Sequence, residues 1–546
     1  MIMQNSASSA QILRFGNFEV NLRAGEVWKA GRKRKLTGQP FSVLCILLER
    51  PGEVVSREEL QKRLWPDTFV DVDHSLNTAI NKIREALNDS SEHPHFIETL
   101  SRRGYRFIAP VESVELAASS IPNAIISPDA KPARISDHQD ESFWIAVLPF
   151  KAPGSADLTA LAQGITEDII TALSRFSYLR VILLRSIQRY TDNALDVRTV
   201  GKELGARYVM EGSIRQAGAR VRLAVQLIDA DSGALLWAEA YDRVALPESA
   251  FDLQDDVVPQ IVSTVADTHG VLPRSMAETL HTRDPAKFTP YEAVLCGFAH
   301  FQRVNAEDHA RARKALEHAV QQAPGYADAW AMLSLIYKEE FTHRFNLRSD
   351  PIARAFSAAH RAVEAGPSNH LAHHALAAAH FFRKELPAFR IAAHRAIELN
   401  PMDGFTLAYL GFLIAYSGDW ERGGALSAKA RSLNPHHPGW YWFVPCFDAY
   451  RKGEYRRALE FVQKVNMPGF WRTNLALAAI CGQLDHVDPA REAALALLTQ
   501  RPEFPVTARE ELAIWWEPVL VDHLIEGLRK AGLKVREPKT GLAAAG

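Results

Sequence analysis

Three proline-terminated phrases spaced 34 residues apart constrain the fold of this 546-residue chain more than any other feature of its sequence. The phrases RAVEAGP, RAIELNP and ARSLNP end at Pro367, Pro401 and Pro435, so both intervals are 34 residues (401 − 367 and 435 − 401). A related phrase ends at Pro324, 43 residues upstream (367 − 324), and we place the excess in an insertion around residues 341–350. Self-similarity at this period predicts stacked helix pairs, each burying its apolar face against the next.

The helix–proline–helix pattern at this period resembles the tetratricopeptide repeat. Residues 285–535 are therefore expected to form an all-α solenoid whose concave face binds a protein or peptide partner. The sequence leaves open which aromatic residues of the array pack in the core and which line a groove, among them Tyr409, Phe412, Tyr441, Trp442 and Tyr450.

The first 110 residues have a different pattern. Short alternating segments separated by Gly and Asn turns predict a small antiparallel sheet from residue 12 onward. Two helices are expected next: one stops at Pro51, and the other begins at Ser56, an N-cap with a glutamate three residues on, and stops at Pro66.

A third helix, over residues 71–87, has two contrasting faces. Its apolar face carries a stripe at helical spacing: Leu76, Ile80, Ile83 and Leu87. Its other face carries amide, hydroxyl and cationic groups: Asn77, Asn81 and Arg84, flanked by Thr78 and Lys82. Such groups suit base edges and phosphates in a major groove. Taken alone, this face is equally consistent with the solvated side of an ordinary surface helix.

A basic turn follows the helix. Residues 96–100 and 105–107 read as two strands joined by a short turn of Ser101, Arg102, Arg103 and Gly104. Guanidinium groups at a hairpin tip can enter a minor groove or pair with phosphate. We therefore interpret the hairpin as a DNA-binding wing, with a random basic turn as the alternative.

The order of meander, three helices and a wing ending ETLSRRGYRF resembles the OmpR/PhoB-type winged-helix domain, in the version found in CadC/ToxR-like regulators. By that resemblance Asn81, Lys82 and Arg84 contact DNA. Asn81 and Lys82 fall where response-regulator members often carry paired arginines, a departure that bears on the target sequence. The loop over residues 65–72 would meet RNA polymerase through Asp67, Thr68 and Asp71.

The densest basic run, residues 31–35, is a tempting second contact with DNA. The resemblance places it on a hairpin of the N-terminal sheet, away from the third helix. We interpret it as a solvated turn.

The middle of the chain predicts a linker over residues 111–142 and a small α/β domain over 143–270. The phrases IAVLPF, GITEDI, EGSIR and LWAE resemble the TolB-N-terminal-like domain, to which no catalytic chemistry is assigned. Glu167 and Asp168 are a carboxylate pair, but adjacent helical positions diverge by about 100° and cannot share one substrate atom. We expect them in the first turn of a helix.

Several classes of function find no support. No P-loop, GxSxG or GxGxxG stands in a suitable context, so no enzyme and no cofactor are predicted. His370 and His374 lie four residues apart on one helix face, but no HExxH pattern completes a metal site, and we predict none. The four scattered cysteines read as buried thiols. With neither a signal peptide nor a spanning apolar stretch, we expect a cytoplasmic protein without membrane contact.

The sequence therefore predicts a multidomain α+β protein, with a winged helix-turn-helix at 12–110, a central α/β domain and a C-terminal solenoid. The favoured function is a one-component transcription regulator that binds double-stranded DNA and RNA polymerase. With no receiver domain ahead of the winged helix, control by phosphorelay is not expected. The alternative is a tetratricopeptide scaffold whose winged helix binds protein. The oligomeric state stays open, a homodimer being one arrangement.

Overall fold

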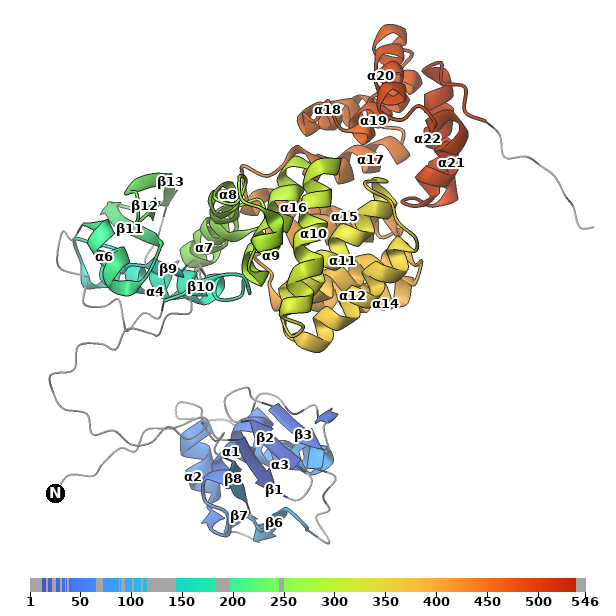
Figure 1. Cartoon of the computed structure of the whole chain (residues 1–546). Helices are drawn as coiled ribbons and strands as arrows, with labels where there is room; N and C mark the ends of the chain where they lie inside the picture. The colour runs from blue at the N-terminus through green and yellow to red at the C-terminus, as the bar shows by residue number, and fades with distance from the viewer. Residues whose placement is uncertain are drawn as a thin grey trace, which may run out of the picture. The chain divides into compact units, whose positions relative to one another are not determined.

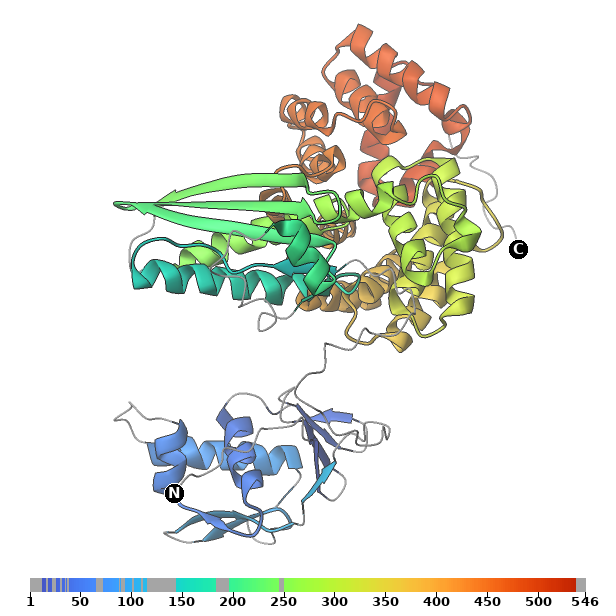
Figure 2. The same ribbon diagram turned by 60° about the vertical axis from the view of Figure 1, so that its left-hand side comes forward.

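The computed structural model describes residues 12–15, 18–21, 26–29, 32–34, 36, 39–64, 72–87, 89, 94–100, 103–109, 111–114, 144–182, 196–244 and 250–536. The chain divides into two compact units, Met1–Asp137 and His138–Gly546. Figure 1 and Figure 2 show the elements of each unit.

The first unit begins with an antiparallel meander, as the alternating segments predict. Its sheet has the order β4-β3-β2-β1-β8, with strands β1 (Ile12–Phe15), β2 (Phe18–Asn21), β3 (Glu26–Lys29), β4 (Arg32–Arg34) and β8 (Glu112–Val114). The middle of the basic run is therefore an edge strand rather than a turn, with Trp28 opposite Lys33.

Three helices and a second sheet complete this unit. They are α1 (Gln39–Glu49), α2 (Arg57–Leu64), α3 (Val72–Leu87) and the strands β5 (Val54–Val55), β6 (Ile97–Leu100) and β7 (Gly104–Phe107), in the order β5-β7-β6. The expected cap of the second helix is present, because the Ser56 hydroxyl accepts the Glu59 amide at 3.1 Å. A winged helix-turn-helix fold results.

The second unit opens with an α/β layer. Its sheet has the order β10-β9-β11-β12-β13, with strands β9 (Trp144–Val147), β10 (Arg180–Val181), β11 (Tyr208–Ala217), β12 (Arg220–Asp229) and β13 (Ala234–Val244). Helices α4 (Ala156–Leu173) and α7 (Ala250–Ala266) cover one face, and α6 (Val197–Leu204) packs on the other. Successive strand residues point to opposite faces, so Ile145 and Val147 join the first core while Ala146 joins the second.

One local expectation for this layer is wrong. Glu167 and Asp168 lie in the interior of α4, not in its first turn, because the helix begins at Ala156 after the Ser155 cap. Both side chains are exposed.

Antiparallel helix pairs form the rest of the unit, a tetratricopeptide-type solenoid. After α8 (Val271–Glu278) they are α9 (Pro290–Arg303), α10 (Ala306–Gln322), α11 (Ala327–Thr342), α12 (Pro351–Ala365), α13 (His370–Phe382), α14 (Leu386–Leu399), α15 (Gly404–Tyr416), α16 (Trp420–Leu433), α17 (Phe443–Arg451), α18 (Tyr455–Val465), α19 (Trp471–Gln483), α20 (Val487–Gln500), α21 (Phe504–Ala513) and α22 (Pro518–Lys530). The prolines of the repeated phrases follow the C-caps of α12, α14 and α16, where a helix cannot continue. The long connection over 343–350 contains the insertion.

The α/β layer and the solenoid share one apolar core. Polar contacts also join them: the Ser177 hydroxyl donates to Asp328 at 2.6 Å, and the Asn434 amide donates to Asp267 at 3.3 Å. No helix within the described residues is long and apolar enough to cross a membrane.

Candidate nucleic-acid interface

Helix α3 is held in place by its apolar stripe. Leu76, Ile80, Ile83 and Leu87 are each at most 1% exposed and pack into the core of the first unit with α1. This confirms the buried face that the sequence predicts. Burying four such side chains fixes the rotation of the helix about its axis, since a turn in either direction would bring apolar surface into water.

The opposite side of α3 presents Asn81 and Lys82, both exposed. An asparagine amide can donate to and accept from an adenine edge, and a lysine ammonium can pair with phosphate. Lys82 forms no ion pair with a described carboxylate, so its charge is available to a ligand. Asn77 and Thr78 also lie on α3, but their side chains fall outside the description.

Arg84 does not share that exposed face, which corrects the sequence interpretation. Its side chain is 9% exposed and turns toward the wing, where Nη2 donates to the Ile97 carbonyl at 3.0 Å and to the Thr99 hydroxyl at 2.7 Å. The helical spacing is as predicted, but strand β6 covers this position. In the described geometry Arg84 connects α3 to the wing instead of facing solvent.

A second residue, which the sequence did not single out, fixes the start of the wing. The Asp89 carboxylate, fully buried, accepts the backbone amides of His95, Phe96 and Ile97 at 2.7, 3.2 and 2.8 Å. Hydrogen bonds to a charged acceptor are among the stronger ones in proteins. Two side chains near the end of α3 therefore set the position of β6.

The wing itself is a regular hairpin. Strands β6 and β7 pair from Ile97 opposite Phe107 to Leu100 opposite Gly104, and Arg106 donates to Glu98 through both Nε and Nη2. On the neighbouring helix α2, Arg57 donates to the Tyr105 hydroxyl at 2.8 Å. These contacts occupy the arginines at the base of the wing.

At the tip, Arg103 is exposed and forms no ion pair with a described carboxylate. Its backbone amide donates to the Leu100 carbonyl at 3.0 Å, which closes the turn. Gly104 follows with φ of 140°, and a Cβ there would lie 2.0 Å from the Val55 carbonyl oxygen. Only glycine fits this close approach between β7 and β5.

Some predicted residues cannot be placed. Ser101 and Arg102 of the wing tip lie outside the described residues, as do Asp67, Thr68 and Asp71 of the loop expected to meet RNA polymerase.

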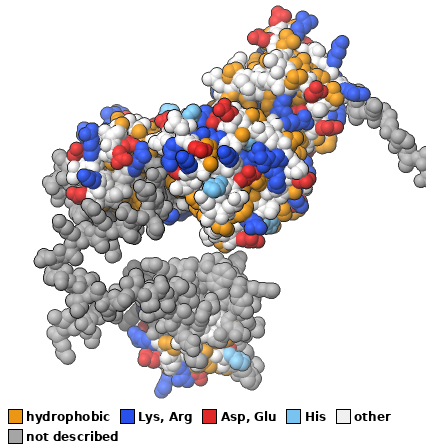
Figure 3. Space-filling view, in the orientation of Figure 1, with side chains coloured by type: hydrophobic (Ala, Val, Ile, Leu, Met, Phe, Trp, Pro, Cys, Tyr) orange, Lys and Arg blue, Asp and Glu red, His pale blue; other side chains and the backbone are white. Residues whose placement is uncertain are grey.

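In the view of Figure 3, the Lys and Arg side chains on the second unit have Asp and Glu side chains among them. Its histidines have structural partners: the His370 side chain lies 3.3 Å from Asp403, and His374 lies 2.9 Å from the Thr406 hydroxyl. Within the described residues, no group of three or more His, Cys, Asp or Glu could hold a metal ion.

Two protein-family models match the chain, one over the winged helix and one over the α/β layer. Residues 31–107 match the family model of the "Transcriptional regulatory protein, C terminal" domain. Residues 141–260 match the model of the "HilA/YgeH-like transcriptional regulator, second domain". Two separate regions of the chain are thus similar to domains of transcriptional regulators.

Curated relatives align with parts of the chain. It is 36% identical over 237 residues to "Putative adenylate cyclase 3" of Rhizobium meliloti (strain 1021), covering 43% of this chain and 40% of the relative. It is 26% identical over 201 residues to "Transcriptional regulator HilA" of Salmonella typhimurium, covering 37% and 32%. "Transcriptional activator CadC" of Escherichia coli (strain K12) is 22% identical over 396 residues, covering 60% and 74%. The alignments to the first two span less than half of those relatives' lengths.

Proposed function

We propose that this chain, whose residues 31–107 belong to the transcriptional regulatory C-terminal domain family, is a one-component regulator that binds specific double-stranded DNA. The observation that carries the proposal is the rigid joining of α3 to the wing. Arg84 and Asp89 tie β6 to the end of α3, while Asn81, Lys82 and Arg103 stay exposed. Such an arrangement can contact base edges in a DNA major groove and, at the same time, the phosphates of the DNA backbone.

The roles divide by chemistry. In this proposal Asn81 reads a base edge, Lys82 and Arg103 neutralise phosphates, and Arg84 positions the wing without reading bases. Four further contacts rest on the sequence alone: Asn77, Thr78, Ser101 and Arg102.

Further parts of the proposal concern partners. The loop carrying Asp67, Thr68 and Asp71 would contact RNA polymerase, and the solenoid would bind a protein or peptide. A homodimer would present two α3 helices to neighbouring half-sites. A cytoplasmic location is part of the proposal, because chromosomal DNA is found there in bacteria.

The name of one relative raises cyclase activity as a second class of function. The matched segment is 40% of that relative's length. The adjacent carboxylates of α4 diverge on the helix surface and both face solvent, which does not suit a shared reaction centre. We propose a non-catalytic chain. Incubation with ATP and Mg²⁺ followed by chromatography should yield no cyclic AMP; its formation in proportion to protein would refute this part of the proposal.

Binding of the full chain to a footprinted DNA fragment, measured by fluorescence anisotropy against salt, tests the main proposal. Removing one phosphate contact lowers the magnitude of the log–log salt slope by about 1. Lys82→Ala and Arg103→Ala should each do so, whereas Arg361→Ala, at an exposed arginine of α12, should not. A folded chain without salt-sensitive DNA binding would favour the scaffold alternative instead.

A further inference from the structure

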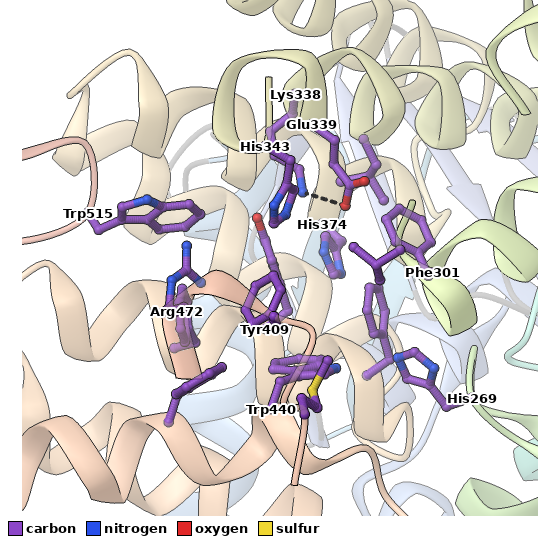
Figure 4. A pocket seen from close by; sticks show the side chains of 17 residues that line it. His269, Phe301, Lys338, Glu339, His343, His374, Tyr409, Trp440, Arg472 and Trp515 are labelled. Atoms are coloured by element: carbon purple, nitrogen blue, oxygen red, sulfur yellow. Dashed lines mark hydrogen bonds and ion pairs between the residues drawn. The ribbon is translucent and has the colours of Figure 1, made fainter. Parts of the chain in front are cut away.

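The inner side of the solenoid encloses a cavity that the proposed DNA-binding function does not use. Its volume is about 80 Å³. Its walls come mainly from the first helices of successive pairs, α9, α11, α13, α15, α17 and α19, and from the segments that connect helices, which supply His269, Trp440 and Trp515. Figure 4 shows these side chains converging on one space. A cavity of this size holds about five to eight water molecules, each of which takes about 30 Å³ in the liquid, so it has room for a flat ligand of about nine non-hydrogen atoms.

Aromatic rings form much of the wall. Eight aromatic side chains line the cavity: Phe301, Phe405, Tyr409, Phe412, Trp440, Phe443, Phe470 and Trp515. Flat rings around a small space favour a flat, apolar ligand body.

One cationic side chain in this wall has no anionic partner. Arg472, on α19, is 4% exposed, and its Nε and Nη2 are buried without a hydrogen-bond partner. No described carboxylate forms an ion pair with it. Its guanidinium carbon lies 4.0 Å from the centre of the Trp515 ring and 5.4 Å from that of Phe412. Ring faces offset part of the cost of burying a cation, but they satisfy none of its N–H donors.

The remaining ionisable groups of the wall leave that charge uncompensated. Burial opposes ionisation of Glu339, but Lys338, 3.4 Å away, and His300, 2.5 Å away, together outweigh it and hold the carboxyl pKa below its ordinary value. This pair is neutral overall. Burial lowers the pKa of His343 and of His374 to about 3, so both rings are uncharged at neutral pH.

The charge on Arg472 itself persists. Burial lowers its pKa to about 10, which still leaves the guanidinium protonated near pH 7. His269, at the far end of the cavity in Figure 4, has a pKa lowered to about 4 by burial and is also neutral. The wall thus carries a net charge of one positive unit, at a fixed place beside aromatic surface.

We propose that this cavity binds a small organic monocarboxylate with a flat apolar body, whose carboxylate pairs with the Arg472 guanidinium. A carboxylate is the anion whose two oxygens match the planar fork of an arginine. The aromatic walls would contain the body of the ligand. Such a ligand would be the effector of the regulator proposed above, but the binding step does not depend on DNA binding and is measured separately.

Benzoate is a suitable probe, because benzamide has the same size and shape without the charge. Titration of the full chain by calorimetry, with tryptophan fluorescence as a second signal, should detect benzoate binding at concentrations up to about 10 mM, since even about 0.3 kcal/mol per ligand atom gives a Kd near 10 mM. Benzoate should bind at least about tenfold more tightly than benzamide.

The decisive variant is Arg472→Met. It should weaken benzoate at least about 30-fold, because truncating one partner of a buried charge pair has at least this effect. Benzamide binding should change little, and its retention shows that the cavity is intact. Arg361→Met, at an exposed arginine stacked 5.1 Å from Trp330, is the matched control and should leave both ligands unaffected.

The proposal would be overturned by no benzoate binding of the wild-type chain at about 10 mM, by equal binding of benzoate and benzamide, or by unchanged benzoate binding of Arg472→Met. A peptide that binds through its C-terminal carboxylate while benzoate does not would also overturn it. If Arg472→Met does not fold, Arg472→Lys keeps the charge and should keep the preference for benzoate at reduced affinity; loss of the preference would count against the pairing.

Discussion

Replacing Arg84 by methionine tests whether the wing is positioned from α3. Methionine keeps an unbranched apolar chain but removes the donor to Ile97 and Thr99. Hydrogen bonds from a charged group contribute about 1.5–3 kcal/mol each, and the Ile97 carbonyl would lose a buried partner. Relief of the buried charge offsets part of this. We expect the wing to open more easily by about 3 kcal/mol.

Hydrogen exchange of the full chain, measured by mass spectrometry, reports the opening of the wing strands separately from the rest of the chain. An opening free energy lower by about 3 kcal/mol makes the amides of β6 and β7 exchange about 100-fold faster. DNA affinity should fall while the salt slope stays unchanged, since no phosphate contact is lost. Lys82→Met is the matched control, because it should lower the slope by about 1 and leave exchange unchanged.

One result would contradict the positioning role of Arg84. If Arg84→Met left wing exchange unchanged but lowered the salt slope by about 1, Arg84 would contact DNA directly and the positioning role would be wrong.

Three further predictions concern stability. Gly104→Ala should destabilise the first unit by more than about 2 kcal/mol in urea unfolding, because its Cβ would overlap the Val55 oxygen, whereas Gly52→Ala, at φ of 87° with open space, should cost about 1 kcal/mol. Asp89→Ala should cost about 3 kcal/mol by the same measurement, since three backbone amides lose a charged acceptor; an effect below about 0.5 kcal/mol would contradict that role. Burial raises the pKa of Asp267 to about 7, so the folded second unit binds a proton that the unfolded chain releases, and its stability should fall by about 1 kcal/mol between pH 6 and pH 8. Asp267→Asn should remove this part of the pH dependence, and an unchanged profile would refute it.

The sequence predicts elements whose pattern is local. The buried stripe of α3 follows from the spacing of Leu76, Ile80, Ile83 and Leu87, and the repeated helices follow from the prolines at their ends. Both signals depend only on the chain's own periodicity. The glycine of the wing tip is visible as a turn residue, but its close approach to Val55 is not.

Contacts between distant segments could not be predicted in this way. Arg84 has the helical position of a solvent-facing residue, and only the placement of β6 shows that it is covered. Ser177 meets Asp328 across 151 residues, so the sharing of one core by the α/β layer and the solenoid has no local signature. Arg472 becomes notable only when the solenoid brings rings from several helices around it.

The structure also shows which of the aromatic residues named in the sequence analysis line the cavity and which pack in the core. Tyr409 and Phe412 line it, whereas Tyr441 and Tyr450 are each 1% exposed within the packed core. Trp442 stacks on Phe461, with ring centres 5.7 Å apart. The sequence places these five residues within the array, but the direction in which each side chain points depends on how the helices stack.

DNA reading by α3 and the wing is tested by the salt dependence of binding of the intact chain to its own footprinted site, compared with a scrambled fragment of equal length. We expect binding at least about 1,000-fold tighter to the footprinted site. We also expect a steep salt slope that falls by about 1 in magnitude with Arg103→Ala. Equal, weak binding to both fragments, or a slope that Arg103→Ala leaves unchanged, would contradict reading of DNA by α3 and the wing.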